Sequence, residues 1–183
     1  MSLLFHQHRM WTHHDVAGYS LMSPEECELI ASQIPENAGP EFRVLEIGTY
    51  NGASAAHVLS KRPRISWLGI DIFRAEPAFA TMCFLANRAK HKNLNCFIGS
   101  ARQWLAWQGP AARADLVIVD GGHSEAECRD DLDVASQVST TIICHDYGVR
   151  CFPGIVKAVD EFPGWRIVER ERSAVLLQPE AMP

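Results

Sequence analysis

Two short segments of the chain combine histidine with aspartate. Asp120 and His123 stand in the sequence Val-Asp-Gly-Gly-His, and His145 and Asp146 are neighbours in the sequence Cys-His-Asp-Tyr. An imidazole that titrates near neutral pH can remove a proton from a hydroxyl group, and carboxylates are good ligands for divalent cations. If the two segments meet in space, the sequence predicts a site there for proton transfer or metal binding.

A third segment has the composition of a ligand-binding loop. Glu46 ends an apolar stretch and is followed by Gly48 and Gly52, which stand four residues apart. A glycine at the first position allows a sharp turn and a close approach to a ligand, and a glycine at the second allows a helix to start close to a sheet. Tyr50 stands where the dinucleotide fingerprint requires its second glycine, so the sequence argues against an NAD site.

The hydrophobic pattern predicts the elements that position these segments. From residue 41 onward, short apolar runs alternate with helix-like stretches, which is typical of a mainly parallel sheet with helices on both faces. Because ligands of such sheets bind beyond the carboxyl ends of the strands, Asp120 and His145 should face one crevice. Runs without polar alternation, at 117–119 and 141–143, predict the centre of the sheet. The predicted strands are residues 43–47, 66–72, 95–98, 115–119, 140–144, 165–169 and 174–178.

Helix signals fill the gaps between these strands. Ser23 with Glu26, and Ser124 with Glu127, have the spacing of capping boxes, which predicts helices over about 24–33 and after Ser124. Further helices are expected after Gly52, from Pro77 and along the apolar stripe at 155–162. The last two strands are too close together for a helical crossover and must form an antiparallel hairpin. The prediction is an α/β, Rossmann-like fold with a seven-stranded mixed sheet, helices on both faces and a C-terminal hairpin.

The glycine loop resembles the first motif of the class I S-adenosylmethionine-dependent methyltransferases, an acid-x-Gly-x-x-x-Gly loop matched by Glu46, Gly48 and Gly52. The resemblance implies that this loop holds the methionine part of the cofactor. It also implies that Asp71, 25 residues after Glu46, accepts hydrogen bonds from the ribose hydroxyls. A carboxylate suits a vicinal diol because both of its oxygens can accept. The alternative for Asp71 is a turn residue or a helix N-cap.

Ser100 stands where many members of that family carry an acid that meets the adenine amino group. Its hydroxyl could accept that bond, or it could be the N-cap of a helix that contains Trp104 and Trp107. We expect both tryptophans in the core. The cofactor-binding residues that the resemblance implies are Glu46, Gly48, Thr49, Tyr50, Asn51, Gly52, Asp71, Ile72, Ser100, Ala101 and Asp120.

The two histidine–aspartate segments resemble the D-G-x-H and H-D-Y (or D-D-Y) motifs of one methyltransferase branch. This branch includes the macrocin and mycinamicin sugar O-methyltransferases and the cephalosporin hydroxylase-like proteins. Residues 154–162 resemble its G-x-x-K-A-V-D-E-F helix, and the resemblance covers 41–178. It implies methylation of a hydroxyl on a small molecule, with S-adenosylmethionine as cofactor.

In metal-dependent members of that branch, carboxylates at these two strand ends hold Mg2+. At the matching positions of this sequence, the resemblance makes Asp120 and Asp146 the candidate ligands for Mg2+ or Mn2+ and His123 the candidate general base. His145 stands where some members carry a second acid, and imidazole suits Mn, Fe, Ni or Zn better than Mg2+. His145 could be a second base or a histidine bonded to the backbone. The candidate catalytic residues are His123, His145 and Asp146.

Residues 147–153 are expected to rim the acceptor pocket, with Arg150 available for an anionic acceptor. A homo-oligomer could complete the pocket. Two other classes of function remain open. A metal-dependent hydrolase could use Asp120, His123, His145 and Asp146 without the glycine loop, and a non-catalytic S-adenosylmethionine-binding module would need only the cofactor residues.

Composition limits the remaining possibilities. The 183 residues predict one domain over 23–183, preceded by an arm over 1–22. The net charge of -5 has the wrong sign for holding nucleic acid, and no apolar run is long enough for a membrane span. Six cysteines without a C-x-x-C pair indicate reduced thiols and a cytoplasmic protein. The arm holds four histidines, read as solvated or as a metal-binding tail: His6, His8, His13 and His14.

Overall fold

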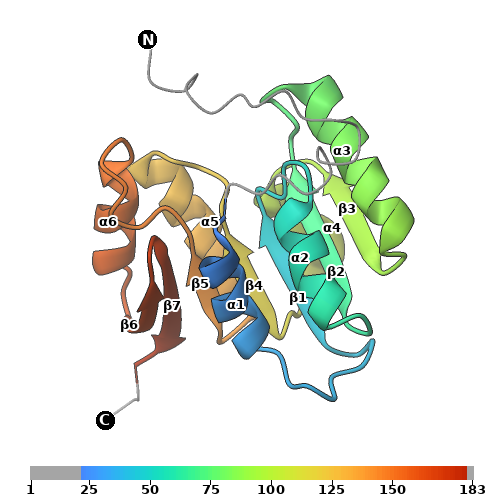
Figure 1. Cartoon of the computed structure of the whole chain (residues 1–183). Helices are drawn as coiled ribbons and strands as arrows, with labels where there is room; N and C mark the ends of the chain where they lie inside the picture. The colour runs from blue at the N-terminus through green and yellow to red at the C-terminus, as the bar shows by residue number, and fades with distance from the viewer. Residues whose placement is uncertain (1–21, 181–183) are drawn as a thin grey trace.

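The strands of the protein form one seven-stranded sheet in a computed structural model that describes residues 22–180 (Figure 1). Their order across the sheet is β3-β2-β1-β4-β5-β7-β6. The apolar runs predicted for the sheet centre lie in β4 and β5, as expected. The strands are β1 Arg43–Ile47, β2 Ser66–Asp71, β3 Leu94–Ile98, β4 Leu116–Val119, β5 Ile142–Cys144, β6 Trp165–Glu171 and β7 Ala174–Pro179.

Five strands, from β3 to β5, run parallel, and β7 runs antiparallel to both β5 and β6. The predicted C-terminal hairpin is therefore confirmed. The chain builds the sheet outward from β1 to β3 and then crosses back to place β4 on the other side of β1. Ligands of open α/β sheets bind beyond the carboxyl ends of the strands at such a reversal, which lies here between β1 and β4.

Helices cover both faces of this sheet. The apolar side chains of α1, α2 and α3 pack in one buried cluster, and those of α4, α5 and α6 pack in another on the opposite face. Successive residues of the central strands alternate between the clusters, since neighbouring side chains of a strand point to opposite faces. The helices are α1 Pro24–Ser32, α2 Ala53–Lys61, α3 Pro77–Lys90, α4 Ala101–Gln108, α5 Glu125–Val138 and α6 Pro153–Asp160.

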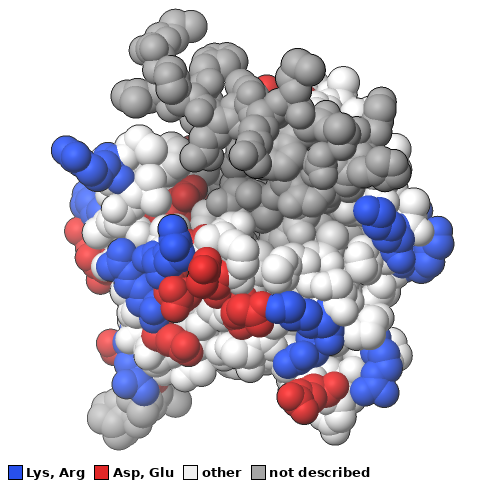
Figure 2. Space-filling view, viewed as in Figure 1, with Lys and Arg blue, Asp and Glu red and all other residues white. Residues whose placement is uncertain are grey.

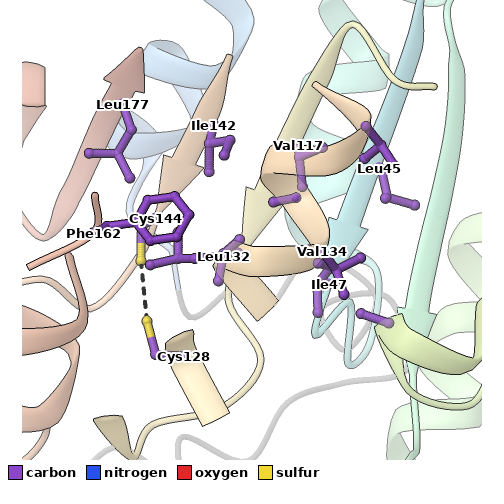
Figure 3. Packing of buried hydrophobic residues seen from close by; sticks show 14 of the residues in the cluster. Leu45, Ile47, Val117, Cys128, Leu132, Val134, Ile142, Cys144, Phe162 and Leu177 are labelled. Atoms are coloured by element: carbon purple, nitrogen blue, oxygen red, sulfur yellow. Dashed lines mark hydrogen bonds between the residues drawn. The ribbon is translucent and has the colours of Figure 1, made fainter. Parts of the chain in front are cut away.

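The buried cluster that includes α5 extends to the carboxyl ends of β4 and β5. Figure 3 shows Leu132 of α5 and Phe162 after α6 packed against strand residues such as Ile142. At the end of this cluster, the sulfur atoms of Cys128 and Cys144 lie 3.9 Å apart as free thiols. The ends of β4 and β5 are therefore supported by closely packed apolar side chains.

The predicted helix starts follow the capping signals. Ser23 and Ser124 both form complete capping boxes at the starts of α1 and α5. Helix α1 ends at Ser32, one residue before the predicted end, because Gln33 serves as its C-cap. Strand boundaries differ from the predicted ones by up to two residues, which is the usual scatter of terminal residues.

The expectation that both tryptophans of α4 are core residues was wrong for one of them. Trp104 is 4% exposed, whereas Trp107 is 72% exposed and stacks on Phe97 of β3, with the ring centroids 5.9 Å apart. Three residues rotate a helix by about 300°, so the two side chains lie only about 60° apart on the helix. Trp104 packs in the core cluster, whereas Trp107 lies over Phe97 of β3, the edge strand of the sheet, and stays exposed.

The packed domain includes Met22, the last residue of the predicted arm, which is 4% exposed and belongs to the cluster of α1. The four arm histidines lie outside the described residues, so both interpretations of them stay predictions. No helix within residues 22–180 has the length and hydropathy to cross a membrane. Acidic and basic side chains lie interspersed on the face of the described residues that Figure 2 shows.

Candidate active site

Asp120 and His145 lie side by side because the strands that precede them are neighbours. β4 and β5 run parallel with Val119 opposite Cys144, so the next residue of each strand leaves the sheet at the same edge. The backbone N–H of His145 donates to the carbonyl oxygen of Val119 at 2.9 Å. The two histidine–aspartate segments therefore meet in space.

His123 and Asp146 form a pair at the mouth of this site. The Nε2 atom of His123 lies 3.2 Å from Oδ2 of Asp146, and the His123 ring stacks on Phe152 with centroids 4.1 Å apart and planes 12° apart. The hydrogen bond that His123 donates to Asp146 raises the pKa of His123, although partial burial opposes this. Asp146 thus fixes one edge of the ring and Phe152 fixes one face.

Asp146 holds an unusual backbone conformation, with φ at +61°. This left-handed region is uncommon for residues with a side chain, and such residues concentrate at functional sites. The conformation turns the carboxylate toward two histidines, with Oδ1 3.4 Å from Nδ1 of His145 and Oδ2 near His123. The next residue, Tyr147, is anchored by its N–H on the carbonyl oxygen of Ser173 at 2.9 Å.

His145 lies behind these residues and is only 4% exposed. Its Nδ1 atom lies 2.9 Å from Oδ1 of Asp120, and its Nε2 atom lies 3.4 Å from Oε2 of Glu26. Burial alone would lower the pKa of His145, but Asp120 and Glu26 together with Asp146 raise it to about 10. Both ring nitrogens of His145 thus face protein carboxylates, and its role as a second base stays a prediction.

Three side chains face one hollow at this end of the sheet. Asp120, His123 and Asp146 each offer an oxygen or nitrogen atom, and these atoms all lie within 4.8 Å of one another. Burial raises the pKa of the Asp120 carboxyl, although the adjacent His145 opposes this. The hollow is a shallow depression, open to solvent and without enclosed room for a water molecule, and Ile155 lines it beside the polar groups. Formed ligand pockets enclose roughly 300–1,000 Å³, so a ligand at this hollow would lie mostly outside it.

The glycine loop after β1 packs against the end of β4. Gly48 has φ at +88°, and a Cβ atom there would lie 2.2 Å from the carbonyl oxygen of Asp120. The close approach predicted for Gly48 is thus to the protein's own backbone, which connects the loop to the hollow. Gly52 has φ at +69°, and a Cβ atom there would lie 3.0 Å from Phe84 of α3 and 3.5 Å from Leu94 of β3. The start of α2 is therefore close to the sheet, as expected, and closer still to α3.

Glu46 is buried beneath this loop, with 1% of its surface exposed. Its Oε2 atom accepts hydrogen bonds from Thr49 Oγ1 at 2.7 Å and from Trp67 Nε1 at 3.1 Å, and its Oε1 atom accepts one from Ser54. Burial raises the pKa of Glu46 to about 7, although these hydrogen bonds oppose the shift. Its carboxylate therefore shapes the loop and does not reach the surface where a cofactor would lie.

Thr49 and Asn51 are also buried, at 3% and 4% exposure. Asn51 Oδ1 accepts from the N–H of Ala53 at 3.0 Å and so holds the start of α2. Tyr50 lies at the surface between them, and its hydroxyl donates to Oε2 of Glu76 at 2.9 Å. Of these three predicted cofactor residues, Tyr50 is the one whose side chain is accessible to a ligand.

Asp71 ends β2 beside the loop, as predicted. Its Oδ2 atom accepts from the N–H of Tyr50 at 2.7 Å, and its Oδ1 atom accepts from the N–H of Phe73 at 2.5 Å. Each carboxylate oxygen has a second lone pair and can still accept from a ribose hydroxyl. Asp71 is therefore a turn residue by its hydrogen bonds and is compatible with a diol ligand as well.

Apolar side chains are exposed on both sides of Asp71. Ile72 is 49% exposed, and Ile98, which pairs with Asp71 across the two strands, is 75% exposed. Ile98 was missed by the sequence reasoning, because an isoleucine at a strand end is expected to be buried. Ser100 is the N-cap of α4, with Oγ accepting from the N–H of Gln103 at 3.2 Å, and Ala101 is buried in the core. The N-cap interpretation of Ser100 is confirmed, and its contact with adenine stays a prediction.

The predicted rim of the acceptor pocket contains one residue that touches the site. Phe152 contacts His123, while Arg150 is exposed and Tyr147 is turned to the other side, where its hydroxyl donates to Asp160 Oδ1 at 2.8 Å. The stacking of Phe152 was not predicted from the sequence. Nothing in the spacing of an aromatic residue within a loop indicates which ring it will meet.

A family described as a methyltransferase domain matches residues 45–147 of the chain. The match spans more than half of the 183 residues. It runs from the glycine loop to the end of the second histidine–aspartate segment. The chain therefore belongs to this methyltransferase family. No curated protein sequence matches it significantly.

Solved structures share the fold. A candidate O-methyltransferase from Klebsiella pneumoniae superposes with a TM-score of 0.66 at 17% identity, over 92% of this chain and 86% of that chain. TomG from Streptomyces achromogenes, an O-methyltransferase of tomaymycin synthesis in complex with SAM, has a TM-score of 0.59 at 15% identity, over 88% and 82%. A candidate RNA methyltransferase from Pyrococcus horikoshii has a TM-score of 0.60 at 15% identity, over 84% and 80%. At these identities the likeness establishes the fold and does not select the acceptor.

Proposed function

We propose that this protein transfers the methyl group of S-adenosylmethionine to a hydroxyl oxygen of a small molecule, as its resemblance to the macrocin and mycinamicin sugar O-methyltransferases implies. The observation that carries the proposal is the convergence of Asp120, His123 and Asp146 on one hollow in a member of a methyltransferase family. Family membership also favours methyl transfer over the hydrolase alternative.

The groups around Asp71 support binding of the nucleoside part of the cofactor. The Asp71 carboxylate has lone pairs free for two ribose hydroxyls, and the exposed side chains of Ile72 and Ile98 offer apolar contact to a flat base. Between this position and the hollow runs the loop that Gly48 holds against Asp120. A cofactor that spans this distance would bring its methyl end to the hollow. TomG, which shares the fold, was solved with SAM bound.

His123 is the proposed general base. With its Nε2–H donated to Asp146, the neutral ring carries its lone pair on Nδ1, which can accept the proton of the acceptor hydroxyl. The acceptor oxygen then bonds to the methyl carbon while the carbon–sulfur bond breaks, and the sulfonium becomes a neutral thioether. Because Asp146 stabilises the imidazolium that results, the proton can stay on His123 until product leaves.

The same hollow fits a divalent cation. Asp120 and Asp146 would hold Mg2+ or Mn2+, and a donor set of two carboxylates and one imidazole suits Mn2+ the better of the two. When bound, such an ion lowers the pKa of a coordinated hydroxyl. A His123 nitrogen that binds the ion cannot accept a proton, so the two roles of that nitrogen exclude one another.

The test uses S-adenosylmethionine with a 13C-labelled methyl group and a panel of sugars, phenols and polyols, with and without Mg2+ or Mn2+. We expect an O-methyl resonance with the wild-type protein and its loss in His123→Gln. His91→Gln, on the far end of α3, is the matched control and should keep the activity. Transfer to nitrogen or to RNA in place of oxygen would contradict the proposed acceptor class, and full activity in His123→Gln would remove His123 as the base.

A further inference from the structure

Glu26 of α1 is a buried acid behind the proposed site. It is 3% exposed and does not line the hollow. The sequence identified Glu26 only as the third position of a capping box. In the structure its Oε2 atom also lies 3.4 Å from Nε2 of His145. An acid from the first helix thus reaches a histidine at the end of the fifth strand.

Both oxygens of Glu26 are held by the protein. Oε2 accepts from the N–H of Ser23 at 2.7 Å, and Oε1 accepts from Ser173 twice, from its N–H at 3.0 Å and from its Oγ at 2.5 Å. These hydrogen bonds and His145 lower the pKa of Glu26, although burial opposes the shift. The carboxylate is therefore fixed in place by α1 on one side and by the turn between β6 and β7 on the other.

Helix capping does not explain where Glu26 lies. Glu127 takes the same position in the capping box of α5, with Ser124 as its N-cap, and it is exposed to solvent. A capping glutamate needs contact only with its own N-cap backbone. Burial of Glu26 against His145 and Ser173 removes a charge from water, and such burial is tolerated only with compensating partners. The position points to a task beyond capping.

The His145 ring connects Glu26 to the hollow. One ring nitrogen faces Glu26, and the other lies 2.9 Å from Oδ1 of Asp120. A ring with a carboxylate at each nitrogen cannot rotate without losing both partners. Outer partners of this kind set the orientation of the groups that meet a ligand. Contacts therefore lead from Glu26 of α1 through His145 to Asp120, which lines the hollow.

We propose that Glu26 is a positioning residue of the methyl-transfer site, which holds His145 from behind so that His145 holds the Asp120 carboxylate toward the hollow. The importance of Asp120 rests on the proposed function, but the contact chain does not. Glu26 acts through His145 and touches no ligand itself.

Glu26→Gln tests this role, because glutamine also serves at the third position of a capping box. The substitution keeps the size and one oxygen and removes the charge that faces His145. Glu25→Gln is the matched control. It lies in the same helical turn and is exposed, so it removes an equal charge without touching His145. Thermal unfolding of both variants establishes that they fold.

The first readout is the proton resonance of the ring N–H that His145 donates to Asp120. It is expected far downfield and is assigned by its loss in His145→Asn. We expect Glu26→Gln to shift or abolish this resonance and Glu25→Gln to keep it. If Glu26→Gln does not fold, Glu26→Asp replaces it, since the shorter side chain keeps the charge but withdraws the carboxylate from Nε2 of His145 and should shift the same resonance. An unchanged resonance in the folded variant would overturn the proposal.

The second readout is the affinity for S-adenosylhomocysteine in single and double variants. We expect Glu26→Gln and Asp120→Asn each to weaken binding by about tenfold, and the double variant to weaken it no further, because both changes act on one chain of contacts. Additive losses would mean that Glu26 does not act through Asp120. If the wild-type protein binds no S-adenosylhomocysteine, the proposed function fails, and the resonance still decides the role of Glu26.

Discussion

His123 and Asp146 come from the ends of different strands, yet Nε2 of His123 lies 3.2 Å from Oδ2 of Asp146. The pair is held by the left-handed backbone of Asp146 and by the Phe152 ring that covers His123. A histidine oriented by a carboxylate at one nitrogen is prepared to accept a proton at the other. This geometry supports the proposed role of His123 as the general base.

Substitution of His123 should separate chemistry from binding. We expect His123→Gln to reduce methyl transfer by about 10²- to 10⁴-fold, the usual contribution of a general base. The affinity for S-adenosylhomocysteine should stay within about twofold, because the proposed base acts on the acceptor hydroxyl and not on the cofactor. Single-turnover transfer and calorimetry measure the two quantities. An equal loss in both would indicate that His123 binds the cofactor and does not act as the base.

Substitution of Gly48 should damage both stability and the site. Gly48→Ala places a Cβ atom 2.2 Å from the backbone of Asp120 and requires a residue with a side chain to adopt φ at +88°. We expect a loss of about 2–4 kcal/mol in the free energy of unfolding, measured by urea denaturation.

Gly164→Ala is the control for Gly48. Gly164 also has a positive φ, at +76°, but no atom lies within 4 Å of the added Cβ position. Strain of the backbone alone should lower stability by about 1 kcal/mol in this variant. Equal losses at the two positions would mean that contact with Asp120 contributes nothing.

The buried Glu46 should make stability fall as pH rises. Its folded-state pKa of about 7 lies above the ordinary value of 4.5, so the folded state binds the proton more tightly than the unfolded state. Its contribution is therefore fully present below about pH 4.5 and is lost as pH rises to about 7, at no more than about 1.4 kcal/mol per pH unit.

Glu46→Gln should remove that part of the pH dependence. A glutamine oxygen can accept from Thr49 and Trp67 while its amide group donates to Ser54 Oγ, so the contacts are kept and only the Ser54 hydroxyl proton must turn to another acceptor. We expect the variant to unfold at a higher temperature than the wild type above pH 7, measured by melting curves from pH 4.5 to 8. A wild-type slope that persists unchanged in Glu46→Gln would assign the pH dependence to other groups.

Substitution of Asp71 should weaken cofactor binding in a protein that still folds. Asp71→Asn keeps one accepting oxygen for the N–H of Tyr50 but places an amide group opposite the N–H of Phe73, so the turn loses one hydrogen bond. We expect about tenfold weaker binding of S-adenosylhomocysteine, because a bond to a ribose hydroxyl is lost in a partly buried place. Asp115→Asn, at the opposite end of the sheet before β4, is the control and should bind normally. Unchanged affinity in Asp71→Asn would leave Asp71 as a turn residue only.

The sequence predicted the sheet well because its signals are local. Strand β1 was predicted with its observed bounds, and the capping serines Ser23 and Ser124 marked the observed starts of two helices. The short interval before Ala174 required the hairpin. Each of these signals depends on residues close together in the chain, so no knowledge of tertiary packing was needed.

The site was predicted in its parts and not in its connections. Asp120 and His145 meet because neighbouring parallel strands end at one edge of the sheet, which follows from strand direction alone. The contact of Glu26 with His145 joins segments far apart in the sequence, and no periodicity or motif spacing reports it. The burial of Glu46 likewise depends on the side chains of Thr49 and Trp67 that close over it.

Calorimetric titration of the wild-type protein with S-adenosylhomocysteine, with and without Mn2+, addresses the central claim most directly. We predict saturable binding of one ligand per chain. Absence of any binding heat at millimolar ligand, from protein shown to be folded by its melting curve, would contradict the claim that this member of the methyltransferase family uses S-adenosylmethionine.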